Sequence, residues 1–261
     1  MTPHVNPLRK LLRAVVPASL RSRIRKRLAL HPALSNFYER AYEAIAATLP
    51  AAAAIGGGDF DLFGRIELGL LQLEGVRPSD TVVDFGCGTG RLAVQLVPYL
   101  QGGRYLGIDI STGMLREAAR RTRSDGCQVE WRHQRTERFD LPDASVDALV
   151  AFSVFTHMEA EDSYRYLAEA LRVVRPGGKL LFSCLPLSLH EARQVFLSSA
   201  RLDLAERWAQ VRNIVTTEET METLAILAGW KVVRWHRGDQ AAVPGLPPLG
   251  QSTCVLERPS A

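Results

Sequence analysis

Short apolar runs alternate with amphipathic runs through the middle of the chain. Apolar runs rich in Val, Ile and Leu predict buried strands, and apolar residues three or four positions apart predict helices. The runs that predict strands cover residues 81–85, 104–108, 128–132, 146–152 and 179–184. Those that predict helices cover residues 91–100, 112–123 and 161–174, the last stopped by Pro176, Gly177 and Gly178. This alternation predicts βαβ units and a parallel sheet.

The segments before the first strand are patterned as well. Residues 37–49 and residues 59–74 each predict a helix. Between them, Pro50 and the Ala- and Gly-rich run 51–58 predict a linker or hinge. Nearer the N-terminus, an apolar stripe predicts one more helical face, formed by Leu8, Leu11, Leu12, Val15 and Val16 and ended by Pro17.

The most informative stretch is the end of the first strand together with the turn after it. The strand ends in Asp84 and Phe85, and glycines then occupy every second position, at Gly86, Gly88 and Gly90. Glycine lets a ligand approach the backbone, and the helix after the turn directs its free N–H groups to the same place. This pattern predicts a strand, a tight turn that binds a ligand, and a helix N-terminus.

A second acid lies at the end of the next strand. Asp109 is about 20 residues beyond the glycines, where a nucleoside-binding fold holds the ribose hydroxyls. The glycine spacing is Gly-x-Gly-x-Gly rather than Gly-x-Gly-x-x-Gly, and Asp84 stands just before it. A carboxylate there suits a ligand with an ammonium group better than a dinucleotide with two phosphates.

Four ordered blocks carry a family resemblance. They read VVDFGCGTGRLA, YLGIDIS, FDLPDASVDALVAFSVFTHM and ALRVVRPGGKLLFS. In this order and spacing the chain resembles the class I S-adenosylmethionine (AdoMet)-dependent methyltransferases from about residue 77 to 185, with a tail to residue 257. The resemblance implies an α/β, Rossmann-like seven-stranded sheet, mostly parallel with an antiparallel last strand, and helices on both faces. Residues 230–236 and 251–257 would be the final two strands.

The resemblance also implies the cofactor, AdoMet, and the residues that bind it. Asp84 and the glycine turn, Cys87 included, would hold the methionine end, and Asp109 the ribose. The other residues that would line the site are Ile110 and Met114 beside the adenine, and Phe152 and Ser153 near the sulfonium. Two alternatives stay open: Asp109 could instead complement a helix dipole, and Met114 could be ordinary core.

One residue departs from the family pattern. Many relatives carry an acid after the third strand, which meets the adenine amino group, whereas this chain has Arg135. Arginine has only donors and cannot accept from an amine. A backbone carbonyl near Arg135 or Thr136, or the side chain of Glu137, would have to replace the acid.

His157 is the candidate general base. It comes after the fourth strand, at the carboxyl edge where such folds bind ligands, and its ordinary pKa lies near working pH. The alternative is a loop histidine that only packs or caps. AdoMet chemistry mainly needs alignment of the acceptor and exclusion of water, so most site residues should be binders. Arg91 would either contact the cofactor carboxylate or stay solvated.

Length and composition limit the number of domains, the metal sites and the location of the protein. The chain has 261 residues, 46% of them hydrophobic, which suits one α/β domain with one core. Its four cysteines are scattered singly, so we expect no metal site and a reduced, cytoplasmic protein. No apolar run is long enough to cross a bilayer.

Charge is distributed unevenly. Residues 1–30 hold eight Lys and Arg and no acid, so the net charge of +4 leaves −4 on the remainder. An acidic body argues against a nucleic-acid partner. We therefore expect a basic helical N-terminal arm and hinge over residues 1–58 and the methyltransferase domain over residues 59–261. The arm could lie on an anionic membrane, or be a solvated or self-docked extension.

Residues 186–216 form the expected substrate-side insert. The segment mixes apolar residues with four arginines, which suits either a partly apolar acceptor bearing acidic or hydroxyl groups or an ordinary amphipathic lid. We predict methyl transfer to a small molecule, with a saccharide or lipid-linked hydroxyl as the favoured acceptor. The alternatives are N- or C-methylation of a metabolite, and a non-catalytic AdoMet-binding scaffold at a membrane. The sequence identifies neither the acceptor nor the oligomeric state.

Overall fold

The computed structural model describes residues 32–54 and 58–260. The chain divides into two units, Met1–Tyr38 and Glu39–Ala261. The second unit contains the whole sheet, and helix α3 (Pro32–Thr48) spans the boundary between the two. The basic segment 1–30, with its predicted membrane role, lies outside the described residues, and the predicted boundary at residue 58 stays a prediction.

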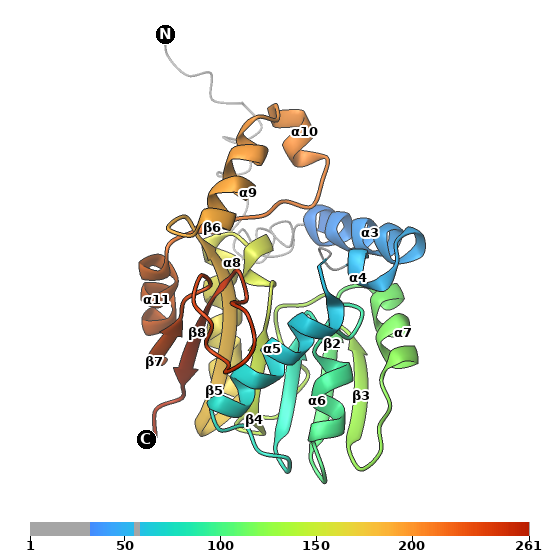
Figure 1. Ribbon diagram of the computed structural model, residues 1–261, viewed down its shortest axis with the longest axis vertical. Helices are drawn as coiled ribbons and strands as arrows, with labels where there is room; N and C mark the ends of the chain where they lie inside the picture. The colour runs from blue at the N-terminus through green and yellow to red at the C-terminus, as the bar shows by residue number, and fades with distance from the viewer. Residues whose placement is uncertain (1–31, 55–57, 261) are drawn as a thin grey trace, which may run out of the picture. The chain divides into compact units, whose positions relative to one another are not determined.

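The core is one sheet with strand order β3-β2-β1-β4-β5-β8-β7 (Figure 1). Its strands are β1 (Thr81–Phe85), β2 (Arg104–Asp109), β3 (Gln128–His133), β4 (Val146–Ala151), β5 (Val174–Pro186), β7 (Lys231–His236) and β8 (Ser252–Glu257). β1 to β5 pair in parallel, and β8 runs antiparallel between β5 and β7. The predicted Rossmann-like fold with an antiparallel last strand is confirmed. An eighth, two-residue strand, β6 (Val215–Thr216), pairs with β5 off this path.

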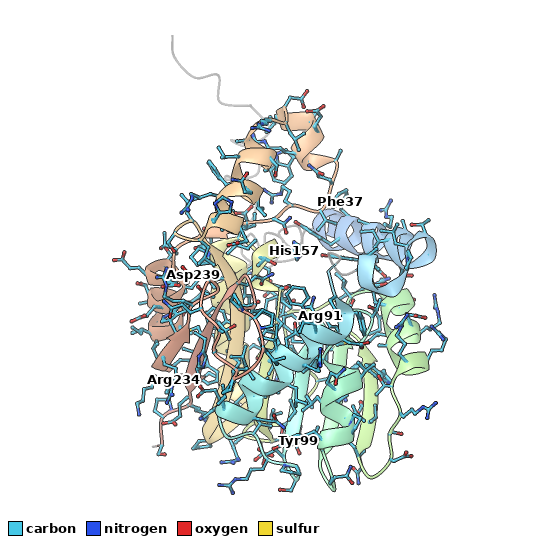
Figure 2. The ribbon with its side chains drawn as sticks, viewed as in Figure 1. Phe37, Arg91, Tyr99, His157, Arg234 and Asp239 are labelled. Atoms are coloured by element: carbon cyan, nitrogen blue, oxygen red, sulfur yellow. The ribbon has the colours of Figure 1, made fainter. Side chains whose placement is uncertain are left out.

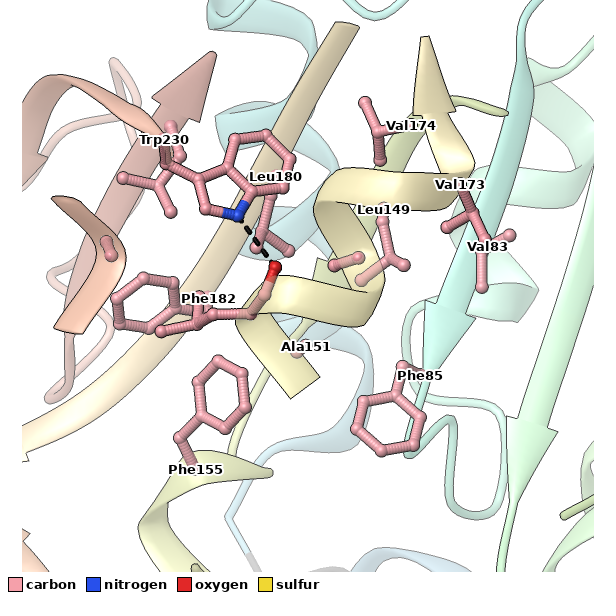
Figure 3. Packing of buried hydrophobic residues seen from close by; sticks show 14 of the residues in the cluster. Val83, Phe85, Leu149, Ala151, Phe155, Val173, Val174, Leu180, Phe182 and Trp230 are labelled. Atoms are coloured by element: carbon pink, nitrogen blue, oxygen red, sulfur yellow. Dashed lines mark hydrogen bonds between the residues drawn. The ribbon is translucent and has the colours of Figure 1, made fainter. Parts of the chain in front are cut away.

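Neighbouring residues of each strand pack on opposite faces of the sheet. In β1, Val82 packs in a cluster with α5 (Phe60–Leu73) and α6 (Ala93–Tyr99). The next residue, Val83, packs in the other cluster with α8 (Ala160–Val173) and α11 (Glu218–Leu227). Figure 3 shows part of that second cluster, where the Trp230 indole N–H donates to the Leu167 carbonyl at 2.8 Å. Because both faces are covered, the central strands contain continuous apolar runs, such as residues 148–151 of β4 and 180–182 of β5.

β5 begins five residues earlier than the sequence predicts. Pro176, Gly177 and Gly178 were expected to separate the helix from the strand, but Val174 already pairs with Val146. The pairing then jumps to Lys179 opposite Ala148, so residues 175–178 form a bulge. Gly177 accommodates the bulge with a φ of +73°. The helix stop was correct, and the strand resumes around it.

Residues 51–54 and the insert 186–216 both contain short helices. Residues 51–54, expected to be part of a hinge, form the short helix α4 (Ala51–Ala54), in which Ala54 is buried. The insert contains α9 (His190–Ala200) and α10 (Leu204–Trp208). Several of its apolar side chains are exposed: Leu187, Phe196, Leu197, Leu204 and Trp208. Among the described residues, no helix is long and apolar enough to span a membrane.

Candidate active site

The glycine turn joins the end of β1 to the end of β2. The N–H groups of Gly86 and Cys87 both donate to the Ile108 carbonyl, at 2.8 and 3.1 Å. Gly86 has a φ of +74°, and a Cβ there would lie 2.4 Å from Val154 Cγ2. Gly90 has a φ of +87° and packs on Ala118 of helix α7 (Thr112–Arg121). A side chain at Gly86 would therefore clash with the loop after β4.

Asp109 connects the glycine turn to the start of α7 through hydrogen bonds to its carboxylate. One carboxylate oxygen accepts from the Gly88 N–H at 2.9 Å, and the other accepts from the Ser111 N–H at 2.9 Å. Ser111 in turn caps α7 by accepting from the Met114 N–H at 3.1 Å. Each Asp109 oxygen keeps a further lone pair, so the carboxylate can still accept from two vicinal hydroxyls. The backbone contact and the ribose role are thus compatible.

Asp84 lies in a buried group of charges beneath the turn. Its carboxylate accepts from the Tyr105 hydroxyl at 2.7 Å. Nearby, Glu67 of α5 pairs with Arg91 at 2.5 Å, and its side chain is only 2% exposed. The Arg91 side chain is 14% exposed, so it is not a solvated helix-start residue. Its Nε is buried and has no hydrogen-bond partner among the described residues.

The carboxyls of this group are reluctant to ionise. Burial, opposed by Tyr105 and reinforced by the charges of Glu67 and Asp109, raises the pKa of Asp84 to about 7. Burial likewise raises the pKa of Glu67 and of Asp109. Arg91 pairs with Glu67, whereas Asp84 and Asp109 form no ion pair among the described residues. A ligand that carries positive charge would favour the ionised form of these carboxyls.

The residues after β3, which were predicted to lie near the adenine, depart from the family pattern as the sequence indicates. Arg135 is exposed and pairs with Glu39 of α3, while Thr136 Oγ1 donates to the Arg138 carbonyl. Glu137, the side chain that was predicted to replace the missing acid, already pairs with Arg165 at 2.6 Å. Met114 is buried and Ile110 is partly exposed.

Gln134 is a candidate site residue that the sequence did not single out. Its N–H donates to the Asp109 carbonyl at 3.0 Å, and its Nε2 donates to the Thr136 carbonyl at 3.0 Å. Its Oε1 is buried without a hydrogen-bond partner in the described part of the chain. The one signal in the sequence was its place immediately after the third strand, next to Arg135.

Helix α3 packs beside this region. Glu43 accepts from Thr112 Oγ1 at 2.9 Å and from the Gly113 N–H at 3.1 Å, at the first turn of α7. The Tyr42 ring lies edge-on to His157, with 6.2 Å between ring centroids. The sequence predicted a helix here but gave no indication of what it contacts.

The loop after β4 carries the remaining predicted residues. Phe152 is buried, and Ser153 adopts a φ of +58°, which is rare for a residue with a side chain. The 3-10 turn η1 (Phe155–His157) comes next. In Figure 2, His157 and Arg91 lie toward the same end of the sheet, and Tyr99 lies at the other. The structure therefore brings the glycine turn, Asp109 and this loop to one edge.

His157 is held in one tautomer. Its Nδ1 lies 2.8 Å from the Arg212 carbonyl, which can only accept, so Nδ1 carries the hydrogen. Burial, opposed by this hydrogen bond, lowers the pKa of His157 from its ordinary value. The Arg212 side chain pairs with Glu159 at 2.7 Å and lies over the Trp208 ring at 4.1 Å. The His157 ring is therefore neutral, with a lone pair on Nε2. The Arg212 carbonyl, which belongs to the insert, holds the ring in place.

A family comparison accounts for the same stretch. The profile described as "Methyltransferase domain" matches residues 82–178, from the glycine-turn strand into β5. Residues 82–178 therefore form a methyltransferase domain. The sequence resemblance and its implied fold are confirmed, and so is AdoMet as the cofactor of the family.

Curated relatives of this chain are named for more than one substrate. It is 27% identical over 195 residues to a malonyl-[acyl-carrier protein] O-methyltransferase of Hahella chejuensis, covering 70% of this chain and 64% of the relative. It is 41% identical over 100 residues to a trans-aconitate 2-methyltransferase of an Azoarcus species, covering 38% of this chain and 37% of the relative. The chain spans about a third to two thirds of the length of such relatives.

A solved structure agrees with the fold. The magnesium protoporphyrin IX methyltransferase of Synechocystis PCC 6803, solved with bound SAH, superposes with a TM-score of 0.62. The two share 16% sequence identity over 85% of this chain and 97% of the other. At this identity the likeness establishes the fold of the chain and nothing of its function.

Proposed function

We propose that this chain binds AdoMet at the glycine turn and transfers its methyl group to an oxygen atom of a small molecule. The observation that carries the proposal is the group of three buried carboxyls at the turn, Asp84, Glu67 and Asp109, whose pKa values are raised by burial. AdoMet brings an ammonium and a sulfonium, which are the charges that such a site favours.

The residues present fit this cofactor. Asp84 would face the ammonium, and the unpartnered Nε of Arg91 would donate to the carboxylate. Asp109 would accept from the ribose hydroxyls. The buried Gln134 Oε1 offers an acceptor for the adenine amino group, in place of the acid that Arg135 lacks. The ammonium, the carboxylate, the ribose and the adenine would each have a partner of the right polarity.

His157 supports an oxygen acceptor. The bound cofactor supplies a methyl group already activated by the sulfonium. The chain must then align the acceptor, exclude water and accept a proton if the acceptor is a hydroxyl. The lone pair of His157 Nε2 is available for that proton, because Nδ1 is committed to Arg212. A carboxylate acceptor would not need this step.

The relatives support a small-molecule or carrier-linked acceptor. One is named for a malonyl-[acyl-carrier protein] substrate and one for trans-aconitate. Neither name supports a saccharide or lipid-linked hydroxyl, so that narrower acceptor stays a prediction. The same holds for membrane association. N- or C-methylation and a non-catalytic scaffold are the alternatives to exclude.

Cofactor binding is the first test. Calorimetric titration should show binding of AdoMet and of S-adenosylhomocysteine (AdoHcy), and none of NAD. Asp109→Ala should weaken AdoHcy binding by about 1.5–3 kcal/mol, the cost of hydrogen bonds lost to a charged group. Asp125→Ala, an exposed aspartate away from the site, is the matched control. Binding of NAD without AdoMet would refute the proposal.

Methyl transfer is the second test. A cell extract incubated with the protein and methyl-labelled AdoMet should yield a labelled small molecule, and mass spectrometry would place the methyl group on oxygen. Label on nitrogen or carbon would favour the alternative methyltransferases. AdoHcy binding without any labelled product would favour the scaffold.

A further inference from the structure

Three hydrogen bonds form a closed ring at the end of β4. The Ser153 N–H donates to Ser183 Oγ at 2.7 Å, and the Ser183 hydroxyl donates to Gln251 Oε1 at 2.7 Å. Gln251 Nε2 then donates to Ser153 Oγ at 2.9 Å. Ser183 lies within β5 and Gln251 immediately precedes β8, so three separate segments meet at Ser153.

The polarity of the ring is set by Ser183. This residue is fully buried, and its oxygen already accepts from the Ser153 backbone. Its own hydrogen needs an acceptor, which Gln251 Oε1 provides. If the Gln251 amide were reversed, the Ser183 hydrogen would lose that acceptor in a buried place, which is costly. The amide therefore donates to Ser153, and the Ser153 oxygen accepts.

The consequence is a hydroxyl hydrogen that the ring does not use. Ser153 Oγ accepts from Gln251, so its hydrogen must be directed elsewhere. The Ser153 carbonyl accepts from Thr156 Oγ1 at 2.9 Å, which fixes the backbone on the other side. The left-handed φ of +58° is unfavourable for a serine. Strain of this kind persists where the surroundings over-determine a position, often at functional sites.

The location places this hydroxyl on the acceptor side of the cofactor. Strand β1 has β2 on one side and β4 on the other, so the strand order reverses at β1. In such sheets ligands bind in the crevice at the point of reversal. Asp109, the ribose residue, ends β2. The loop after β4 is therefore on the opposite side from the nucleoside. Val154 within it approaches Gly86 closely.

We propose that Ser153 determines acceptor specificity by donating a hydrogen bond to an oxygen of the methyl acceptor, and that Gln251 is a positioning residue that directs the Ser153 hydroxyl. The inference rests on the proposed function and deepens it. A fixed donor selects groups that offer a lone pair, such as a hydroxyl or a carboxylate, over carbon or a charged amine.

Variants of both residues test the proposal. The acceptor probes are trans-aconitate, a malonyl thioester, methyl glucoside and any extract compound that wild-type protein labels. Ser153→Ala and Ser153→Gly should each lower kcat/KM for the labelled acceptor about tenfold, as expected for one lost hydrogen bond. The glycine variant also relieves the backbone strain, so it separates the hydroxyl from folding. The Kd for AdoHcy should stay within about twofold of wild type, because the proposal assigns this hydroxyl to the acceptor and not to the cofactor.

Gln251→Glu provides a test that leaves Ser153 intact. An ionised carboxylate only accepts, so at about pH 8 it draws the Ser153 hydrogen into the ring and away from the acceptor. This variant should match Ser153→Ala, and the double variant should be no slower than either. Gln240→Glu, an exposed residue of the preceding loop, is the matched control and should behave as wild type.

Each contrary result has a distinct meaning. Full activity in Ser153→Gly, or normal activity in Gln251→Glu, would overturn the proposal and leave the methyltransferase function standing. A tenfold weaker AdoHcy Kd in Ser153→Ala would assign the hydroxyl to the cofactor and also overturn it. Wild-type protein that binds AdoHcy but labels no oxygen acceptor would do the same. Absence of AdoMet and AdoHcy binding would instead refute the proposed function itself.

Discussion

Asp84 shows how a single buried group can report cofactor binding. With a pKa of about 7, its carboxyl is about half protonated at neutral pH. An ammonium beside it would favour the ionised form and lower that pKa. We expect AdoMet or AdoHcy binding at about pH 7 to release about half a proton.

Calorimetry in buffers of different ionisation enthalpy measures this release directly. The observed binding enthalpy should depend on the buffer for wild-type protein and much less so for Asp84→Asn. An enthalpy independent of the buffer in wild-type protein would show that Asp84 does not meet a cation.

His157 makes a prediction about pH. Because its pKa in the folded protein lies below 6.5, the ring is neutral at pH 7. If it accepts a proton, the acid limb of kcat/KM should lie below pH 6.5. His157→Gln should remove that limb and slow turnover by about 10²–10⁴, with unchanged AdoHcy affinity. A pH–rate profile on the labelled acceptor checks this, and an unaltered rate would mean that alignment alone suffices.

The same shift affects stability. The unfolded chain binds a proton at His157 more readily than the folded chain does. His157 therefore contributes stability that is present above about pH 6.5 and is lost as the pH falls through its folded pKa. Urea unfolding of wild type and His157→Gln across this range would show the difference.

At the scale of elements, α3 is joined to α7 through Glu43. Although burial opposes it, hydrogen bonds from Gly113 and Thr112 lower the pKa of Glu43. Glu43→Ala should cost about 1 kcal/mol of unfolding free energy at pH 7, the usual size of a lost helix cap. The contribution is present above about pH 4.5 and is lost as the pH falls through the folded pKa.

Urea titrations at about pH 7 and about pH 3.5 measure this difference. Glu191→Ala, an exposed acid of α9, serves as the control. An equal gap between Glu43→Ala and wild type at both pH values would contradict a role for the ionised carboxylate.

The strands and the glycine turn could be predicted because local pattern determines them. Residues 81–85 were predicted as a strand and form β1, and β2, β3 and β4 agree to within one residue. β5 was predicted too short, because the pairing of Val174 with Val146 is a tertiary contact that overrides Pro176 and the glycines.

The site residues that belong to a sequence motif could be predicted. Asp109 lies at the end of β2 as predicted, beside the glycine turn. The ring at Ser153 was not predictable, because Ser183 and Gln251 are 30 and 98 residues away and no local pattern pairs either of them with Ser153. The same is true of Glu43 and Gln134, whose roles depend on how α3 and β3 end beside α7.

At the scale of the whole molecule, charge separates the N-terminal 30 residues from the rest. These residues carry eight positive charges and no acid, against −4 on the remaining chain. Each basic residue near an anionic surface contributes about 1 kcal/mol. We expect the full chain to bind vesicles that contain phosphatidylserine at low salt and to dissociate at high salt.

A chain that starts at residue 32 is the matched comparison. It should fail to bind the vesicles and should keep its AdoHcy affinity. If the full chain ignores such vesicles even at low salt, the basic segment is not a membrane anchor, and the lipid-linked acceptor loses its support.

The position of β8 has a consequence for how the protein is made. β8 lies between β5 and β7, yet it is synthesised after both. While the ribosome is still translating residues 187–251, β5 and then β7 expose an unpaired backbone edge, which can pair with another chain. The ring that orients Ser153 also waits for Gln251. A nascent chain is thus aggregation-prone and inactive until β8 inserts between β5 and β7. Premature stop codons should therefore yield aggregates rather than partly active enzyme.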